Sequence, residues 1–190
     1  SNIDVEQIQD VIIASVVPKI MYSFTNSIKK YFNKEPIIIG PGIKTGIRIK
    51  IDNPKELGAD RLVDAAGAYY IYGGPCLVID FGTATTFDII NDHGDFLGGA
   101  TAPGIGISVN ALSSQAAKLP EIEIKKPKSI LAQDTIACMQ AGLVFGQVGQ
   151  TEYIIRQMKK EFGRDDVKVV ATGGLGRIIE KETDVIDVYD

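Results

Sequence analysis

The stretch from Leu77 to Asp88 places the tightest limits on how this chain can fold. An apolar run ends on Asp80, a glycine and four small or hydroxyl residues follow, and a second apolar run begins at Phe87. This pattern predicts two antiparallel strands joined by a tight Gly82-Thr83 turn. Backbone N–H groups in such a turn form a concave anion site, and glycine lets a ligand approach closely. The stretch favours a phosphate at the turn and its counter-ion at Asp80, although a plain hairpin with Asp80 capping the turn fits the same residues.

The bulk composition excludes several classes of protein. The chain has 190 residues, of which 45% are hydrophobic and 23% charged, as in an average globular protein. Its net charge of −4 gives no reason to expect a nucleic-acid partner, and no apolar run is long enough to span a membrane. Cys76 and Cys138 lack metal-ligand spacing and are expected to be buried free thiols in a reducing cytosol. His93 lies in a polar turn, which argues against histidine-centred catalysis and histidine-rich metal sites.

Strand and helix signals alternate along the chain. Ser1-Asn2 is interpreted as a cloning remnant, and Gly40-Pro41-Gly42 is predicted to break the strand before it. Apolar periodicity predicts that Ile20, Phe24 and Ile28 share the buried face of one helix, and that Tyr153, Ile154, Met158 and Phe162 share that of another. Helices are predicted over residues 18–32, 61–72, 103–117, from 134 or 135 onwards, and 150–162, and strands over 10–15, 36–39, 47–51, 77–80, 87–90, 96–101, 167–171 and 184–189.

Two further motifs have both a structural and a functional interpretation. Asp60 falls in the first turn of a predicted helix, where the helix dipole favours a carboxylate. Asp60 and Arg61 are either a helix-start carboxylate with a solvated neighbour, which the spacing alone favours, or a carboxylate and a guanidinium that face a substrate. The glycine-rich run 172–176 follows a strand and suits a base or a phosphate, although many strand–helix turns are rich in glycine.

The chain carries an internal similarity. Residues 10–15 resemble residues 166–172, and each segment leads through a turn into a helix, which predicts two related halves. The second half opens with three strands and a helix, and the first lacks that opening, so the chain is expected to be missing its N-terminal start. A stripe of small residues allows close helix packing, either between subunits or in the core: Ala137, Ala141, Gly142 and Gly146.

Four motifs, taken in order, resemble the type III pantothenate kinase family: Gly58-Ala59-Asp60-Arg61, residues 79–86 (IDFGTATT), residues 98–104 (GGATAPG) and residues 171–174 (ATGG). The resemblance extends over nearly the whole chain. It implies an α/β, actin-like ATPase fold with two ribonuclease-H-like halves and nucleotide in the cleft between them. On this basis residues 1–74 are the remainder of the first half, and residues 75–190 are the second half.

The resemblance also implies an activity and its partners. The expected reaction is ATP-dependent phosphorylation of pantothenate to 4'-phosphopantothenate, the first step toward coenzyme A. Magnesium (Mg²⁺) accompanies ATP, and a monovalent cation, potassium or ammonium (K⁺ or NH₄⁺), is required. The family is bacterial and cytoplasmic, and it forms homodimers with pantothenate near the subunit interface.

The resemblance assigns roles residue by residue. Asp60 corresponds to the catalytic base, and the guanidinium of Arg61 suits the carboxylate of the substrate. Asp80 corresponds to the potassium ligand. The other matches are Gly58, Ala59, Asp60 and Arg61 with the pantothenate-binding segment, Thr83 with an ATP contact, Thr135 with a threonine that touches pantothenate from the partner subunit, and Thr172 to Gly174 with the adenosine motif.

Two features depart from the family pattern. The family begins with an Asp-x-Gly-Asn-Thr phosphate-binding strand that does not occur in this sequence, and Ile51 stands where the family often has a tyrosine that touches the substrate. The chain alone is therefore expected to be a poor kinase. One alternative is a non-catalytic ligand-binding or regulatory member of the same fold, against which the retention of Asp60 beside Arg61 argues. Another is an actin-like kinase for a sugar or acetate, against which the Gly58–Arg61 segment argues.

Overall fold

The computed structural model describes residues 4–40 and 43–190, so Ser1-Asn2 and the predicted break at Pro41-Gly42 lie outside the described residues. The helices and strands follow the predicted order, except that the helices predicted from 134 or 135 onwards and over 150–162 are one helix. They are β1 (Ile12–Ile13), α1 (Pro18–Phe32), β2 (Ile37–Ile38), β3 (Arg48–Ile49), α2 (Ala59–Tyr72), β4 (Cys76–Phe81), β5 (Ala84–Ile90), β6 (Asp95–Pro103), α3 (Ile105–Gln115), α4 (Thr135–Phe162), β7 (Lys168–Thr172), α5 (Arg177–Glu180) and β8 (Val188–Tyr189), with short 3₁₀ turns at Val5–Gln7 and Pro54–Glu56.

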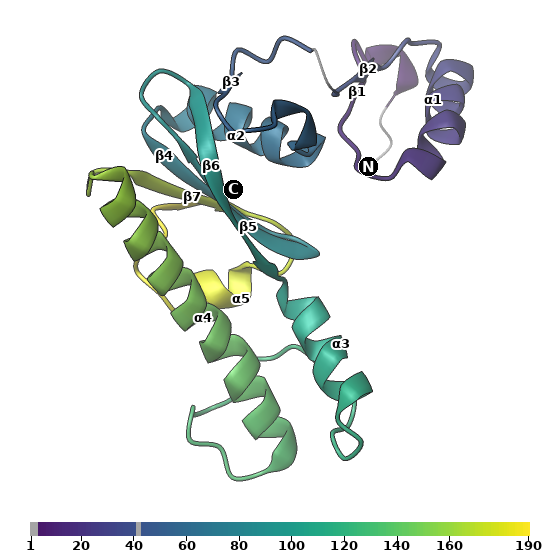
Figure 1. Cartoon of the computed structure of the whole chain (residues 1–190). Helices are drawn as coiled ribbons and strands as arrows, with labels where there is room; N and C mark the ends of the chain where they lie inside the picture. The colour runs from purple at the N-terminus through teal and green to yellow at the C-terminus, as the bar shows by residue number, and fades with distance from the viewer. Residues whose placement is uncertain (1–3, 41–42) are drawn as a thin grey trace.

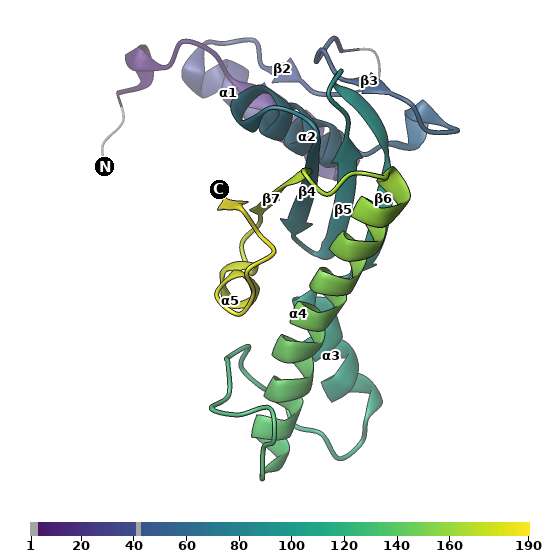
Figure 2. The same ribbon diagram turned by 90° about the vertical axis from the view of Figure 1, so that its left-hand side faces the viewer.

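A six-stranded mixed sheet organises most of the chain, in the order β3-β6-β5-β4-β7-β8. The central strands β4, β5 and β6 pair antiparallel, as the hairpin prediction requires, and the outer strands pair parallel. Helix α4 covers one face of this sheet and α2 the other (Figure 1, Figure 2). Each face has its own apolar core, with Leu77 and Ile79 toward α4 and Cys76 and Val78 toward α2. The structure confirms the predicted α/β class.

The N-terminal elements form a separate small unit. Strands β1 and β2 pair in parallel as a two-stranded sheet with α1 beside them, apart from the main sheet (Figure 1). Helix α1 has the predicted bounds, but the predicted buried face is wrong in part. Only Ile28 is buried, and Ile20 and Phe24 are 53% and 51% exposed, because no described element packs against that side of the helix.

Helix α4 corrects the prediction of two successive helices, because it is one continuous helix of 28 residues. Asp134 caps its start by accepting a hydrogen bond of 2.9 Å from the N–H of Ala137, and Gly163 ends it in the left-handed conformation. Without a proline between these caps, the glycines in the helix lower its propensity but do not break it. Ile154, Met158 and Phe162 pack on the core as predicted, but Tyr153 is 56% exposed.

The two cysteines differ in their environment. Cys76 is buried under α2, as expected, but Cys138 is exposed, because it lies near the start of α4, and that end of the helix extends beyond the sheet (Figure 1, Figure 2). His93 is exposed in its turn, as predicted. Among the described residues, none of the helices combines the length and the apolar character needed to traverse a lipid bilayer.

Candidate active site

A row of polar side chains crosses the α2 face of the sheet. Asp80 on β4 pairs in register with Thr86 on β5 and with Thr172 on β7, and Thr86 pairs with Thr101 on β6. Residues paired in register point to the same face, and side chains alternate along a strand. Since Val78 packs toward α2, Asp80 two residues later also lies on that face, and the three threonines lie beside it. The strand-end carboxylate therefore stands in a row of hydroxyl groups.

The first turn of α2 lies over this face of the sheet. The helix begins at Ala59 after Gly58, so Asp60 occupies the first turn as predicted, and its carboxylate accepts a hydrogen bond of 2.8 Å from the N–H of Arg61. The interpretation of Arg61 as a solvated side chain is wrong. Its guanidinium donates to both carboxylate oxygens of Asp88 on β5, and only a quarter of the side chain is exposed.

Four carboxylates share this part of the molecule. Burial, together with the charges of Asp80, Asp60 and Asp88, raises the pKa of Asp64 to about 7. Burial and the charge of Asp60 raise the pKa of Asp80. The pKa of Asp88 is also raised, because burial outweighs the opposing effect of Arg61. The site thus concentrates negative charge that a bound cation would relieve.

Sequence reasoning missed Asp64 and Asp88. Asp64 lies one helical turn after Asp60, at a spacing that puts both side chains on the same face of α2. Asp88 lies two residues after Thr86, so strand alternation places it on the same face. Both signals were present in the sequence, but each acquires its meaning only when α2 is known to cover this face of the sheet.

Two glycine-containing turns meet at the end of β4. The predicted Gly82-Thr83 turn joins β4 to β5, and Thr83 is exposed there. Gly173 has a φ of +105°, and a Cβ at this position would lie 2.7 Å from the Oδ1 atom of Asp80 and from the backbone of Phe81. Only glycine fits such a place. The Gly82-Thr83 turn, Asp80 and the 172–174 loop, three of the predicted site segments, therefore converge.

Thr135 does not join these residues within one chain. It is exposed in the first turn of α4, at the opposite end of the molecule from α2 (Figure 1, Figure 2). Ile51 packs in the apolar core under α2, and its Cγ2 atom would lie 4.0 Å from a Cβ on Gly98. The position that departs from the family pattern thus lies beside β6.

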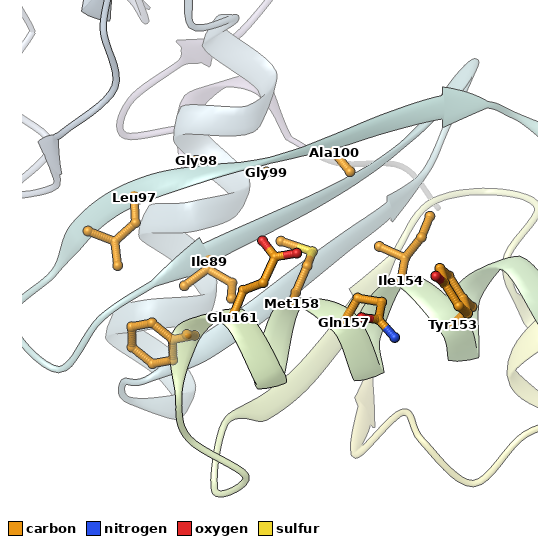
Figure 3. Close-up of a pocket in the computed structure, with 11 residues that line it drawn as sticks. Ile89, Leu97, Gly98, Gly99, Ala100, Tyr153, Ile154, Gln157, Met158 and Glu161 are labelled. Carbon is orange, nitrogen blue, oxygen red and sulfur yellow. The ribbon is translucent and has the colours of Figure 1, made fainter.

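A pocket of about 500 Å³ lies on the other face of the sheet (Figure 3). The backbone of Gly98 and Gly99 forms one wall, and the C-terminal half of α4, including Gln157 and Glu161, forms the other. The carboxylates lie on the α2 face, so β6 separates them from this pocket. No described group of three or more histidine, cysteine, aspartate or glutamate side chains has the geometry to hold a metal ion.

The chain is similar to proteins of known family and structure. The family model described as "Type III pantothenate kinase" matches residues 1–157. A curated type III pantothenate kinase from Agathobacter rectalis is 63% identical over 190 residues, which are 100% of this chain and 73% of that protein. A solved structure described as a conserved putative Baf family transcriptional activator from Campylobacter jejuni has a TM-score of 0.61 and 22% identity, over 98% of this chain and 78% of that chain. That likeness shows a shared fold.

Proposed function

Because this chain belongs to the type III pantothenate kinase family, we propose that it has the actin-like ATPase fold and that it phosphorylates pantothenate with ATP, the first step toward coenzyme A. The observation that carries this proposal is the first turn of α2. It places the carboxylate of Asp60 close enough to Asp80, where the predicted phosphate-binding turn begins, to raise the pKa of that residue, and it places the guanidinium of Arg61 on Asp88 of the adjacent strand β5. We also propose that the chain acts in the cytoplasm and that its two related halves meet near residue 74.

In this reaction Asp60 orients the acceptor hydroxyl and takes its proton. Phosphoryl transfer depends mostly on positioning and on stabilisation of charge, so the base has little covalent chemistry to perform. Asp60 is exposed, which leaves its second oxygen accessible to an acceptor. Gly58, Ala59 and Arg61 complete the segment that binds pantothenate, and the guanidinium pairs with the carboxylate of the substrate.

The nucleotide lies against the two glycine-containing turns. Thr83 contacts the phosphates, and residues 172–174 receive the adenosine. The oxygen atoms of Asp80, Thr86 and Thr172 are the donors that hard cations prefer, and together they suit K⁺ or NH₄⁺. Mg²⁺ is held mainly by substrate phosphates in such sites and needs few protein ligands. Cations held by these residues would offset the charge of the phosphates and of the clustered carboxylates.

A turnover assay tests the proposed function. The protein is incubated with ATP, Mg²⁺ and pantothenate, and ADP and the mass of the phosphorylated product are measured. We expect slow, pantothenate-dependent ADP formation that is lost when potassium and ammonium are replaced by sodium. Calorimetric binding of pantothenate without ADP formation would instead favour the non-catalytic alternative, and turnover only with a sugar or acetate would favour another actin-like kinase.

We further propose that two copies form a homodimer through the outward face of α4. Gly142, Gly146 and Gly149 are exposed there, with nothing within 4 Å of their Cβ positions. Each costs about 1 kcal/mol relative to alanine in a helix, and no packing within the described residues offsets that cost. Ile130 and Leu131 next to this face are 70% and 85% exposed. A closely packed partner helix would account for both features.

An antiparallel pair of α4 helices would also carry Thr135 of one copy toward the sheet of the other. Thr135 precedes Gly146 by eleven residues, or about 16 Å along the helix. If the two-fold axis passes at Gly146, Thr135 of one subunit lies level with Gln157 of the other, because Gln157 follows Gly146 by eleven residues. Gln157 lines the same pocket as Gly98 and Gly99 (Figure 3). Thr135 would then lie near β6 of the partner subunit, on the opposite face of the sheet from the Asp88–Arg61 pair, so its contact with pantothenate is proposed from the family resemblance alone.

The variant Gly146→Leu tests this interface. A bulky side chain blocks close approach of the second helix but improves helix propensity, so we expect a folded monomer. Light scattering coupled to size exclusion should show half the mass of the wild-type particle. The matched control is Ala111→Leu, which places the same leucine side chain at an exposed position of α3 and should leave the mass unchanged. An unchanged dimer in Gly146→Leu would contradict the interface.

A further inference from the structure

The Arg61 side chain is held at one edge by Asp88. The Nε atom of Arg61 donates to Oδ2 of Asp88 at 3.1 Å, and Nη2 donates to Oδ1. This side-on bidentate geometry fixes the plane of the guanidinium as well as its position. The two residues are 27 positions apart in the chain, so the pair joins the start of α2 to the middle of β5. The contact is therefore part of the tertiary structure of the site.

The surroundings of the pair restrict how its two side chains can be arranged. The Asp88 side chain is only 2% exposed, and the ring of Phe96 lies under the guanidinium with its centroid 5.5 Å from Cζ. A Cβ on Gly99 would lie 2.3 Å from Oδ1 of Asp88 and 3.0 Å from Nη2 of Arg61. The double glycine of β6 thus leaves the space that the ion pair occupies.

One edge of the guanidinium stays free for a ligand. Arginine has five N–H donors, of which Asp88 takes two. Among the described residues, Nη1 donates no hydrogen bond, so the Nη1–Nη2 edge remains for a second carboxylate. We propose that Asp88 is a positioning residue, which holds Arg61 so that this free edge binds the carboxylate of the acceptor. The inference rests on the proposed function and deepens it, because it assigns the choice of a carboxylate-bearing acceptor to the Asp88–Arg61–Gly99 unit.

The neighbouring carboxylates explain why such a device is needed. Asp60 also attracts Arg61 electrostatically, and Asp60 and Asp64 stand on the same helix within the acidic cluster. Without a stronger and more buried partner, the flexible guanidinium would turn to one of these groups. The Nη1–Nη2 edge of Arg61 would then be occupied by a carboxylate of the protein, and Asp60 would be less available as a base. Asp88 prevents both by holding the side chain through its other edge.

Asp88→Asn tests the inference with two acceptors. One is pantothenate, and the other is its alcohol analogue, in which a hydroxymethyl group replaces the carboxylate. Asparagine has nearly the same shape but loses the charge and the second acceptor oxygen. We expect the KM for pantothenate to rise roughly tenfold, since charge-assisted hydrogen bonds are the strong ones. The KM values for the alcohol and for ATP should stay within about twofold, so preference for the carboxylate falls.

Asp95→Asn is the matched control. Asp95 pairs with Arg48 through an Nε–Oδ1 contact of 2.6 Å on the same sheet, away from the carboxylate cluster. Loss of that pair should lower the thermal midpoint and leave both acceptor KM values unchanged. If Asp88→Asn instead raises both acceptor KM values equally, or lowers only kcat, the positioning role is overturned.

Calorimetry separates failure of this inference from failure of the proposed function. The dissociation constants of both acceptors are measured for the wild type and Asp88→Asn in the presence of a non-hydrolysable ATP analogue. Carboxylate preference in the wild type and its loss in the variant support the inference even if turnover is absent. Turnover in the wild type without any preference for the carboxylate overturns the inference and leaves the kinase function standing. Absence of both turnover and acceptor binding overturns both.

Discussion

Asp60→Asn is expected to lower kcat for pantothenate phosphorylation by roughly 10²–10⁴-fold, the usual contribution of a general base. Asparagine keeps the shape of the side chain and its hydrogen bond from the N–H of Arg61, but it cannot accept the proton of the acceptor hydroxyl. The dissociation constant of ATP should change little, because the nucleotide contacts come from other segments. The measurement is steady-state ADP formation with saturating pantothenate and potassium.

The same substitution should not destabilise the fold. The charge of Asp60 raises the pKa values of Asp64, Asp80 and Asp88, so removing it relieves repulsion within the cluster, which offsets the lost interactions of Asp60 with the helix dipole and with Arg61. We expect a thermal midpoint equal to or above that of the wild type. Asp165→Asn, the same change at an exposed position beyond α4, is the matched control and should leave kcat unaltered. Full activity in Asp60→Asn would remove Asp60 from the mechanism.

Arg61→Ala is expected to destabilise the protein by about 3 kcal/mol, the lower end of the cost of stripping a partner from a buried ion pair. Asp88, whose side chain is only 2% exposed, would lose its counter-charge. Because the Arg61 side chain is one-quarter exposed, its truncation admits some water to Asp88, which keeps the cost at the lower end. For a chain of this length, the thermal midpoint should fall by roughly 6–12 °C. Thermal and denaturant unfolding measure the change.

The loss in Arg61→Ala should depend on pH. Arg61 lowers the pKa of Asp88 against the effect of burial, so its removal drives that pKa further above the unfolded value. A carboxyl group whose folded pKa is raised loses its stabilising contribution as the pH rises through that pKa. The loss of unfolding free energy in Arg61→Ala, relative to the wild type, should therefore be larger at pH 8 than at pH 5. Adding Asp88→Asn should restore much of the stability at pH 8, and equal losses at both pH values would contradict this account.

Local chemistry in the sequence determined most of the elements around the site. The Leu77–Asp88 pattern specified the hairpin and its turn, because a strand's alternation and a Gly-Thr turn are properties of neighbouring residues. Pro18 marked the start of α1, and Asp60 fell in the first turn of α2 as predicted. Such signals depend on residues that are close in the sequence, so they can be interpreted without knowledge of the fold. The same local reasoning wrongly predicted two helices in place of α4, because no local sequence signal indicates that a helix continues through its glycines.

Only the tertiary structure decided which side chains share an environment. The pairing of Arg61 with Asp88 depends on α2 lying over β5, and burial beside three other carboxylates raises the pKa of Asp64. The exposure of Ile20 and of the glycines on α4 likewise depends on what packs against each helix, which periodicity does not report. Sequence patterns act over a few residues, whereas burial and electrostatic coupling arise from segments that are distant in the chain. The sequence therefore determined the elements and the residue types of the site, and the packing of α2 on the sheet decided their charges and partners.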